Sequence, residues 1–213
     1  LTGYEFPNYI DFVVLYRTNA QSRVIEEVFL KYGIPYKIIG GIRFYARKEI
    51  KDILAYLRLI QNPNDSVSLM RIINTPPRKI GPKTIQSVQE FAAKNNLSLF
   101  SAMLLADEIS GIPKNKAEYI EKFVKTIKNL QIFNNEHRAA GMVKEVLETT
   151  GYKRFIDDGS VEGDARLENV SELISVAKKY DNLEPGIALN IFLEEVSLIA
   201  DIDTLNDQEN AVT

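Results

Sequence analysis

The sequence predicts a mostly helical protein, in which a small α/β fragment is followed by an all-α domain. Three observations support this fold class. Two short runs rich in β-branched and aromatic residues, 12–16 and 36–39, flank a segment of helical periodicity and so predict a strand–helix–strand (βαβ) unit. From residue 50 onwards, apolar residues recur mainly at helical spacing. A short basic turn between two of these helices predicts a helix-hairpin-helix motif.

Composition narrows the class of protein. The 213 residues suffice for one large or two small domains, and 45% apolar with 26% charged residues is ordinary for a soluble globular chain. The net charge is −3, so any contact with nucleic acid must come from a local patch. No apolar run approaches the roughly 18 residues of a membrane span, and no signal peptide is recognisable. Cysteine is absent, which favours a cytoplasmic setting, and the single histidine, His137, is expected at the surface.

The predicted βαβ unit covers residues 12–39. Residues 20–32 have Val24, Ile25, Val28 and Phe29 on one helix face, and Gly33 follows where a helix end favours glycine. Such a unit implies parallel strands and a right-handed crossover. It is too small to cover a sheet by itself, so we expect it to be part of a larger α/β layer.

The loop after the first predicted strand carries Arg17 and Asn19. Ligands of open α/β sheets bind at the carboxyl ends of the strands, and both side chains can bond phosphate oxygens or base edges. The alternative interpretation is a capping loop in which Asn19 caps the following helix. The two interpretations are compatible.

A helix is predicted after Gly40-Gly41, with apolar residues from Ile50 to Ile60 on one face and an end before Asn62-Pro63. The charged residues at 47–51 alternate in sign, which is typical of a solvated face. Further helices are predicted over 98–106, 114–133, 139–149, 166–180 and 187–200, and the acidic, glycine-containing segment 157–164 predicts a mobile loop.

The basic turn lies between predicted helices at 68–73 and from Pro82 onwards. Gly81 followed by Pro82 is typical of a helix start. The first N–H groups of the second helix are free to bind an anion, and Arg78, Lys79 and Lys83 stand beside them. A phosphate of duplex DNA would fit this arrangement. An ordinary turn with a solvated basic rim is the alternative.

Several longer motifs occur in order along the chain: Leu15–Arg23, Gly40-Gly41 with Phe44 and Arg47, Glu49–Asp52, Tyr56–Arg58, Asn74–Pro76 with Arg78 and Ile80-Gly81, Ser98–Phe100, Ser110-Gly111, Arg166–Val170 and Asp207–Thr213. Together these motifs resemble the UvrD/PcrA/Rep group of superfamily-one DNA helicases. The resemblance covers essentially the whole chain.

The resemblance implies a division into domains. In that group a RecA-like motor domain (2A) is interrupted by an inserted helical domain (2B). Residues 1–53 would then be the first part of 2A, with its βαβ unit, and residues 54–207 the insertion with its helix-hairpin-helix. Residues 208–213 would be the strand that returns to 2A.

The resemblance also implies DNA contacts. Arg17 and Asn19 match positions that contact single-stranded DNA. The residues that match or adjoin the duplex-binding hairpin are Thr75, Arg78, Lys79, Ile80, Gly81 and Lys83. The group usually has Gly-Ile-Gly where this chain has Lys79-Ile80-Gly81. Lysine adopts a positive φ less readily than glycine, so we expect a differently shaped turn, with the lysine charge compensating by contacting phosphate.

No catalytic or metal-binding residues are expected within this chain. The sequence has no Gly-x-x-x-x-Gly-Lys-Ser/Thr phosphate loop and no acidic pair in the setting expected for magnesium. The resemblance therefore implies an ATP-dependent 3′-to-5′ helicase whose ATP and Mg²⁺ bind in other domains, so the chain alone should be inactive.

Two classes of function follow. The first is a module of a helicase that grips DNA and regulates unwinding, with DNA and the remaining helicase domains as partners. The second is an interaction module that docks repair or transcription proteins. Salt-dependent binding to duplex DNA would favour the first class, and salt-insensitive binding to a protein the second. An independent enzyme is disfavoured because no catalytic constellation is present.

Overall fold

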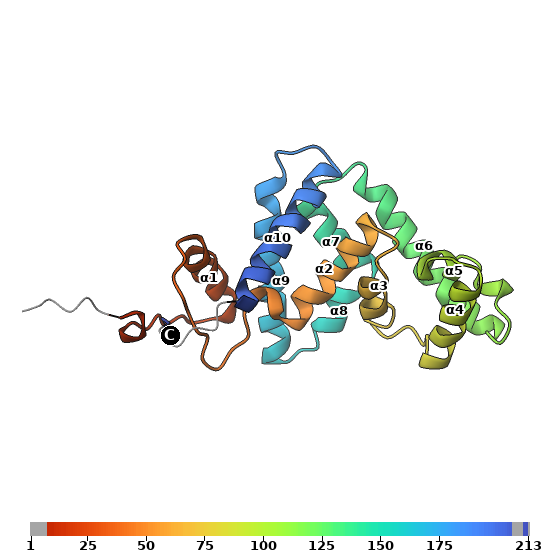
Figure 1. Ribbon diagram of the computed structural model, residues 1–213, viewed down its shortest axis with the longest axis horizontal. Helices are drawn as coiled ribbons and strands as arrows, with labels where there is room; N and C mark the ends of the chain where they lie inside the picture. The colour runs from red at the N-terminus through yellow and green to blue at the C-terminus, as the bar shows by residue number, and fades with distance from the viewer. Residues whose placement is uncertain (1–7, 206–210, 213) are drawn as a thin grey trace, which may run out of the picture.

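The computed structural model describes residues 8–205 and 211–212, and this part of the chain is helical (Figure 1). Its α-helices are α1 (Ser22–Lys31), α2 (Lys48–Gln61), α3 (Ser66–Ile72), α4 (Pro82–Lys94), α5 (Leu99–Met103), α6 (Lys114–Asn134), α7 (Ala139–Thr149), α8 (Tyr152–Ile156), α9 (Val161–Ala177) and α10 (Ile187–Leu205). Short 3₁₀ helices lie at Tyr9–Asp11, Asn19–Gln21, Phe44–Ala46, Ala106–Glu108 and Lys178–Tyr180.

The prediction of a βαβ unit is wrong. Within the described residues no strand forms, and residues 12–15 of the first run are exposed, with Leu15 at 90% of its full accessibility. The segment 36–39 has only an isolated parallel bridge from Tyr36 to Val212, in which the Lys37 N–H donates to the Val212 carbonyl over 2.7 Å. A strand needs a neighbour for its backbone hydrogen bonds, and no described residue pairs with 12–16. Strand-like composition alone was therefore insufficient.

The helix inside that predicted unit is present. It is α1, and Gly33 follows its end with a φ of +64°, the left-handed conformation that glycine adopts readily. The predicted return strand at 208–213 falls mostly outside the described residues. Of its six positions, only Ala211 and Val212 are described, and both are buried.

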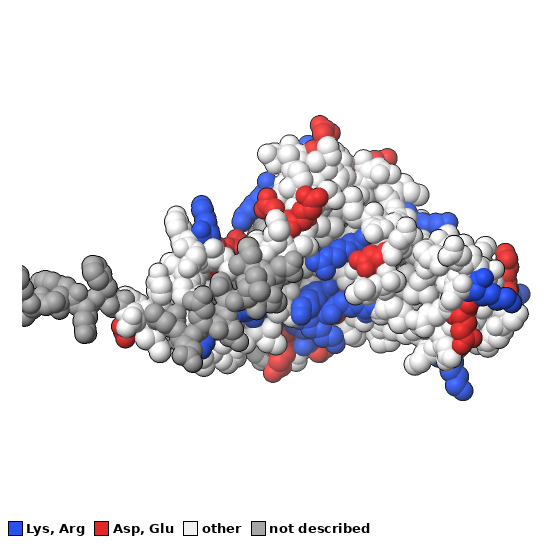
Figure 2. Space-filling view, viewed as in Figure 1, with Lys and Arg blue, Asp and Glu red and all other residues white. Residues whose placement is uncertain are grey.

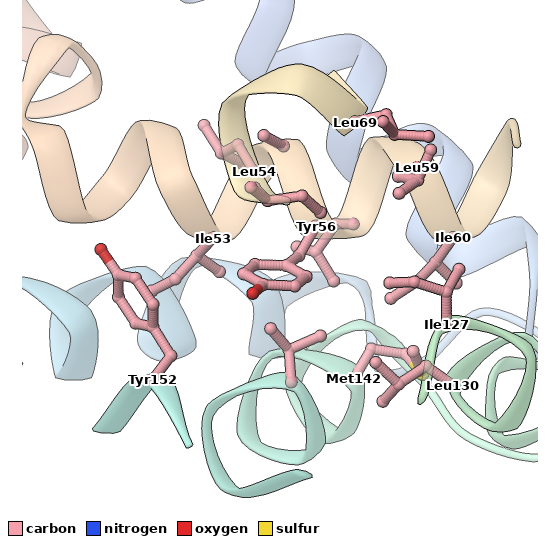
Figure 3. Close-up of a cluster of buried hydrophobic side chains, with 14 of the residues drawn as sticks. Ile53, Leu54, Tyr56, Leu59, Ile60, Leu69, Ile127, Leu130, Met142 and Tyr152 are labelled. Atoms are coloured by element: carbon pink, nitrogen blue, oxygen red, sulfur yellow. The ribbon is translucent and has the colours of Figure 1, made fainter. Parts of the chain in front are cut away.

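Helix α2 is the centre of the core. It contacts α3, α6, α7, α9 and α10, and ten of its residues are buried. Figure 3 shows Tyr56 and Ile60 of α2 facing the side chains of Ile127 on α6 and Met142 on α7. Burying one large apolar side chain contributes roughly 1.5–3 kcal/mol, so this helix orders the elements around it.

The basic turn and α1 lie at opposite ends of the molecule. Figure 1 shows α4 and α5 at one end, beside the first half of α6, and α1 at the other. Helix α4 contacts α5, which in turn contacts α3 and α6. The predicted helices on both sides of the basic turn are present as α3 and α4, and the latter starts at Pro82 after an N-cap at Gly81.

The prediction of a mobile loop at 157–164 is wrong for the second half of this segment. Residues 161–164 form the first turn of α9, because the Ser160 hydroxyl accepts a hydrogen bond from the Gly163 N–H over 2.9 Å. Glu162 and Asp164 lie in that turn, where acidic side chains favour the positive end of the helix dipole. In the remaining part, Asp158 pairs with Arg166 of α9 over 2.6 Å.

Candidate nucleic-acid interface

Residues 73–81, here called the hairpin turn, connect α3 to α4. The side chain of Asn74 holds the two sides of the turn together. Its Oδ1 accepts hydrogen bonds from the N–H groups of Arg78 and Ile80, both over 3.2 Å, and its Nδ2 donates to the Ile80 carbonyl. The Thr75–Pro76 peptide bond within the turn is cis. The turn is thus fixed from within by one amide side chain.

Arg78 points into the protein. Its Nη1 donates to the carbonyl oxygens of Ile72, Ile73 and Pro76, over 2.8, 3.3 and 3.2 Å. Its Nη2 donates to the hydroxyl of Tyr56 on α2, and the guanidinium lies 5.2 Å from the centroid of the Phe123 ring. The guanidinium therefore satisfies carbonyls at the end of α3 instead of facing solvent.

Tyr56 is the buried anchor beneath the turn. Its hydroxyl donates to the Thr75 carbonyl while it accepts from Arg78. Burial raises the pKa of the Tyr56 phenol, and the nearby Arg78 charge opposes this rise. The phenol is therefore a neutral donor that links the turn to the core.

Lys79 is exposed at the tip of the turn and has a φ of +62°. This is the left-handed region, which a side chain with a Cβ adopts at a cost and which glycine adopts readily. Lysine thus occupies a backbone conformation suited to glycine. The following residue, Ile80, is fully buried and anchors the turn in the core.

The start of α4 is open. Gly81 is the N-cap and offers no side chain to the first N–H groups, and Pro82 occupies the first helical position. Lys83 is exposed beside this end, and no described carboxylate lies within ion-pairing distance of it. An uncapped helix start between Lys79 and Lys83 has the donors and the charge that a phosphate needs.

Arg17 and Asn19 lie at the other end of the molecule, just before α1. Arg17 is exposed, and its guanidinium makes no ion pair or hydrogen bond with the described residues. The alternative interpretation, in which Asn19 caps the helix, is wrong, because the N-cap of α1 is Gln21. Gln21 Oε1 accepts from the N–H groups of Arg17 and Thr18, over 2.9 and 3.2 Å. The structure therefore does not bring the two sets of predicted DNA contacts together (Figure 1).

A buried polar network behind Asn19 was missed in the sequence, where residues 47–51 suggested a solvated face. Arg47 is buried, and its Nη2 donates to the Ser22 hydroxyl over 2.7 Å while its Nη1 donates to Asn169 Oδ1 over 2.7 Å. Asn169 in turn donates from Nδ2 to Glu49 over 2.6 Å. Burial lowers the pKa of Arg47, although Glu26 and Glu49 oppose this. The network fixes the loop of Arg17 against α9.

Charge is unevenly distributed over the surface. Figure 2 shows basic side chains gathered near the middle of one face, over the region where Figure 1 places α2, α3 and α8. Two exposed lysines, Lys48 and Lys51, lie in the first turn of α2, and Arg71 of α3 reaches the Lys48 carbonyl and pairs with Asp52 over 2.7 Å. Local basic regions therefore exist despite the net charge of −3.

Among the side chains that the structure describes, in residues 8–199 and 211–212, no three of the histidine, aspartate or glutamate type come together as metal ligands would. In the same part of the chain, every helix falls short of the length and apolar character needed to cross a bilayer.

Comparison with known proteins gives a family match over almost the whole chain. Residues 4–213 match the model of the UvrD-like helicase C-terminal domain. An ATP-dependent DNA helicase PcrA of Staphylococcus epidermidis is 46% identical over 209 residues, and one of Staphylococcus aureus is 46% identical over 212. Each alignment covers 96% of this chain and 28% of the relative, so the chain spans little more than a quarter of their length.

Proposed function

The chain belongs to the family of UvrD-like helicase C-terminal domains, and from this we propose that it is part of an ATP-dependent 3′-to-5′ DNA helicase. In that enzyme it would hold duplex DNA at the hairpin turn and single-stranded DNA near α1. The observation that carries the proposal is the uncapped start of α4 between two exposed lysines, Lys79 and Lys83.

The residues at the turn divide into two roles. Lys79 and Lys83 supply charge, and Gly81 leaves the backbone at the start of α4 accessible. Thr75 is half-buried in the turn and donates from its hydroxyl to the Arg71 carbonyl over 3.2 Å. Arg78 and Ile80 shape the turn from inside, because the first is bonded to carbonyls of α3 and the second is buried. Ammonium and backbone N–H groups bind phosphate without reading bases, so the contact is independent of sequence.

We assign the binding of single-stranded DNA to Arg17 and Asn19. The guanidinium of Arg17 is exposed, and the network of Arg47, Ser22 and Asn169 holds its loop in place. A cation on a fixed backbone is suited to a phosphate because little ordering remains to be done on binding.

The rest of the enzyme is assigned to other parts of the parent protein. The residues of this chain do not fit ATP and Mg²⁺, since it has no phosphate-loop sequence and its described residues hold no cluster of metal ligands. The domain limits 1–53, 54–207 and 208–213 stay part of the proposal, as does the cytoplasmic setting. The first limit falls inside α2, so one continuous helix would belong to both units.

Docking of repair or transcription proteins is a separate proposal. It would be supported by an affinity for such a protein that does not change with salt.

Duplex affinity as a function of salt tests the main proposal. The 213-residue chain should bind duplex DNA with a Kd of about 10⁻⁴ to 10⁻⁶ M at physiological salt, the range of non-specific binding. If about two phosphates are neutralised, log K should fall with log salt at a slope of roughly −2. Lys83→Glu should weaken binding, whereas Lys94→Glu, at the far end of α4, is the matched control. The proposal would be contradicted if both variants weakened duplex binding equally, or if the duplex affinity did not change with salt concentration.

A further inference from the structure

A pocket lies between the hairpin turn and α6, and its α6 side was not among the candidate residues in the sequence. It has a volume of about 310 Å³. Lys79 and Arg78 line it from the turn, and Tyr119, Lys122, Phe123 and Thr126 line it from α6. Lys122, Phe123 and Thr126 follow Tyr119 by three, four and seven positions, so the four side chains share one face of the helix. One wall of the pocket is thus a helix more than thirty positions further along the chain.

Two ammonium groups meet at one aromatic ring in this region. The Nζ atoms of Lys79 and Lys116 lie 5.9 and 5.6 Å from the centroid of the Tyr119 ring. Lys116 also donates from Nζ to the Lys79 carbonyl over 2.9 Å. The ring face attracts cations, so it holds both lysines near the pocket.

The positive charge here has no carboxylate partner. No described acidic residue lies within ion-pairing distance of Lys79, Lys116 or Lys122. Ammonium groups held close together repel one another, and a bound anion would offset that repulsion. Because the guanidinium of Arg78 is bonded to protein carbonyls, the lysines supply the available charge.

We propose that this pocket binds a backbone phosphate of duplex DNA, so that α6 forms a second wall of the interface. The inference rests on the proposed function, since the duplex that meets Lys83 and the start of α4 would continue across Lys79 towards α6. Lysine is a point charge that suits a single phosphate, whereas arginine is the residue of choice for planar recognition of bases. The ligand class is therefore a phosphodiester, without preference for sequence.

The experiment compares three neutralised lysines on α6. Lys122→Gln is the principal variant, because Lys122 is exposed and its ammonium group makes no hydrogen bond or ion pair with the described residues. Lys116→Gln is the second. Lys128→Gln is the control, since Lys128 follows Tyr119 by about two and a half helical turns and lies beside Ile60 in a separate pocket. Duplex affinity of each 213-residue chain is measured from low to high salt.

We expect Lys122→Gln to flatten the slope of log K against log salt by about 0.9 and to weaken binding about eightfold at about 0.1 M salt, the contribution of one phosphate. Lys116→Gln should do the same, and Lys128→Gln should leave the slope unchanged. If Lys122→Gln behaves like Lys128→Gln while Lys83→Glu still weakens binding, the α6 wall is refuted and the proposed function stands.

Three other outcomes also contradict the inference. An effect of Lys116→Gln without one of Lys122→Gln would mean that Lys116 only supports the Lys79 carbonyl. A parent chain that binds no duplex at any salt would remove the proposed function and this inference together. A polyglutamate peptide that displaces DNA as well as a competing duplex of equal charge would show a general anion site instead of a phosphodiester site.

Discussion

Arg47 donates a hydrogen bond from Nη1 to Oδ1 of Asn169 over 2.7 Å, although 122 positions separate the two residues. The same amide donates from Nδ2 to Glu49. One side chain of α9 therefore hydrogen-bonds both the guanidinium of Arg47 and the carboxylate of Glu49 at the start of α2. All three residues are buried. The amide is suited to this position because it offers a donor and an acceptor together, and the loop of Arg17 is consequently fixed to the helical body.

Asn169→Ala should destabilise the protein. The substitution leaves Arg47 and Glu49 buried with one lost partner each, which costs about 2–4 kcal/mol of unfolding free energy. Urea denaturation measures the loss. Glu168→Ala, at the exposed neighbouring position, is the control and should change the free energy by less than about 0.5 kcal/mol. Equal stabilities for the two variants would mean that the network contributes nothing.

Arg78→Gln separates a structural from a DNA-binding role for Arg78. Because the guanidinium bonds to Ile72, Ile73 and Pro76, its loss should lower the free energy of unfolding by about 2–3 kcal/mol. The slope of log K for duplex DNA against log salt should stay unchanged, since no phosphate contact is lost. A stable variant with a slope flatter by about 0.9 would instead identify Arg78 as a direct phosphate contact.

The sequence predicted those parts of the fold that depend on local patterns. Helices α6 and α7 have apolar residues at helical spacing, and the structure has them almost as predicted, at Lys114–Asn134 and Ala139–Thr149. Gly81 and Pro82 likewise marked the start of α4. Such signals are contained within a few neighbouring residues, which is why the sequence alone reveals them.

Features that depend on distant residues were not predictable in this way. The run 12–16 has strand composition, but pairing requires a second segment that the sequence does not identify. Arg47 and Glu49 suggested a solvated face because their partner, Asn169, is remote. The inward direction of Arg78 depends on Tyr56 and Phe123, which lie on other helices. The residue types at the candidate site were predictable, whereas the directions of their side chains were not.

Arg17→Ala should weaken binding of single-stranded DNA and slow translocation in a full-length helicase that contains this segment. The guanidinium is exposed and makes no hydrogen bond or ion pair with the described residues, so folding should be spared. One lost phosphate contact corresponds to a salt slope flatter by about 0.7 for a single strand. Fluorescence anisotropy with a labelled oligonucleotide measures the affinity. An unaltered affinity together with an unaltered translocation rate would refute the assignment of Arg17.

The 213-residue chain alone should not hydrolyse ATP, with or without DNA. Its sequence has no Gly-x-x-x-x-Gly-Lys-Ser/Thr loop to hold the phosphates of a nucleotide. Phosphate release is measured with the purified chain and with a variant carrying Lys83→Glu. ATP turnover that DNA stimulates, that survives repeated purification and that falls in the variant would belong to the chain and would contradict this prediction.

Lys79 has a strained backbone conformation and an ammonium group without an ion-pair partner among the described residues. Three substitutions distinguish the effect of the backbone strain from the effect of the charge. At a φ of +62° a residue with a Cβ costs about 1–2 kcal/mol, so Lys79→Gly should raise the free energy of unfolding by up to that amount. Lys79→Gln and Lys79→Glu keep the Cβ and should leave the stability within about 0.5 kcal/mol of the parent. Urea denaturation of the three variants tests this part.

Duplex binding should follow a different order. Lys79→Gln loses one charge, so its salt slope should flatten by about 0.9, and Lys79→Glu should bind more weakly still because it repels phosphate. Lys79→Gly loses the same charge as Lys79→Gln, yet its backbone can approach a phosphate more closely, so at high salt it should bind more tightly than Lys79→Gln. Equal affinities of the glycine and glutamine variants at high salt would show that close backbone approach does not contribute. If Lys79→Glu also bound as tightly as the parent chain at every salt concentration, the hairpin turn would be an ordinary connection between two helices.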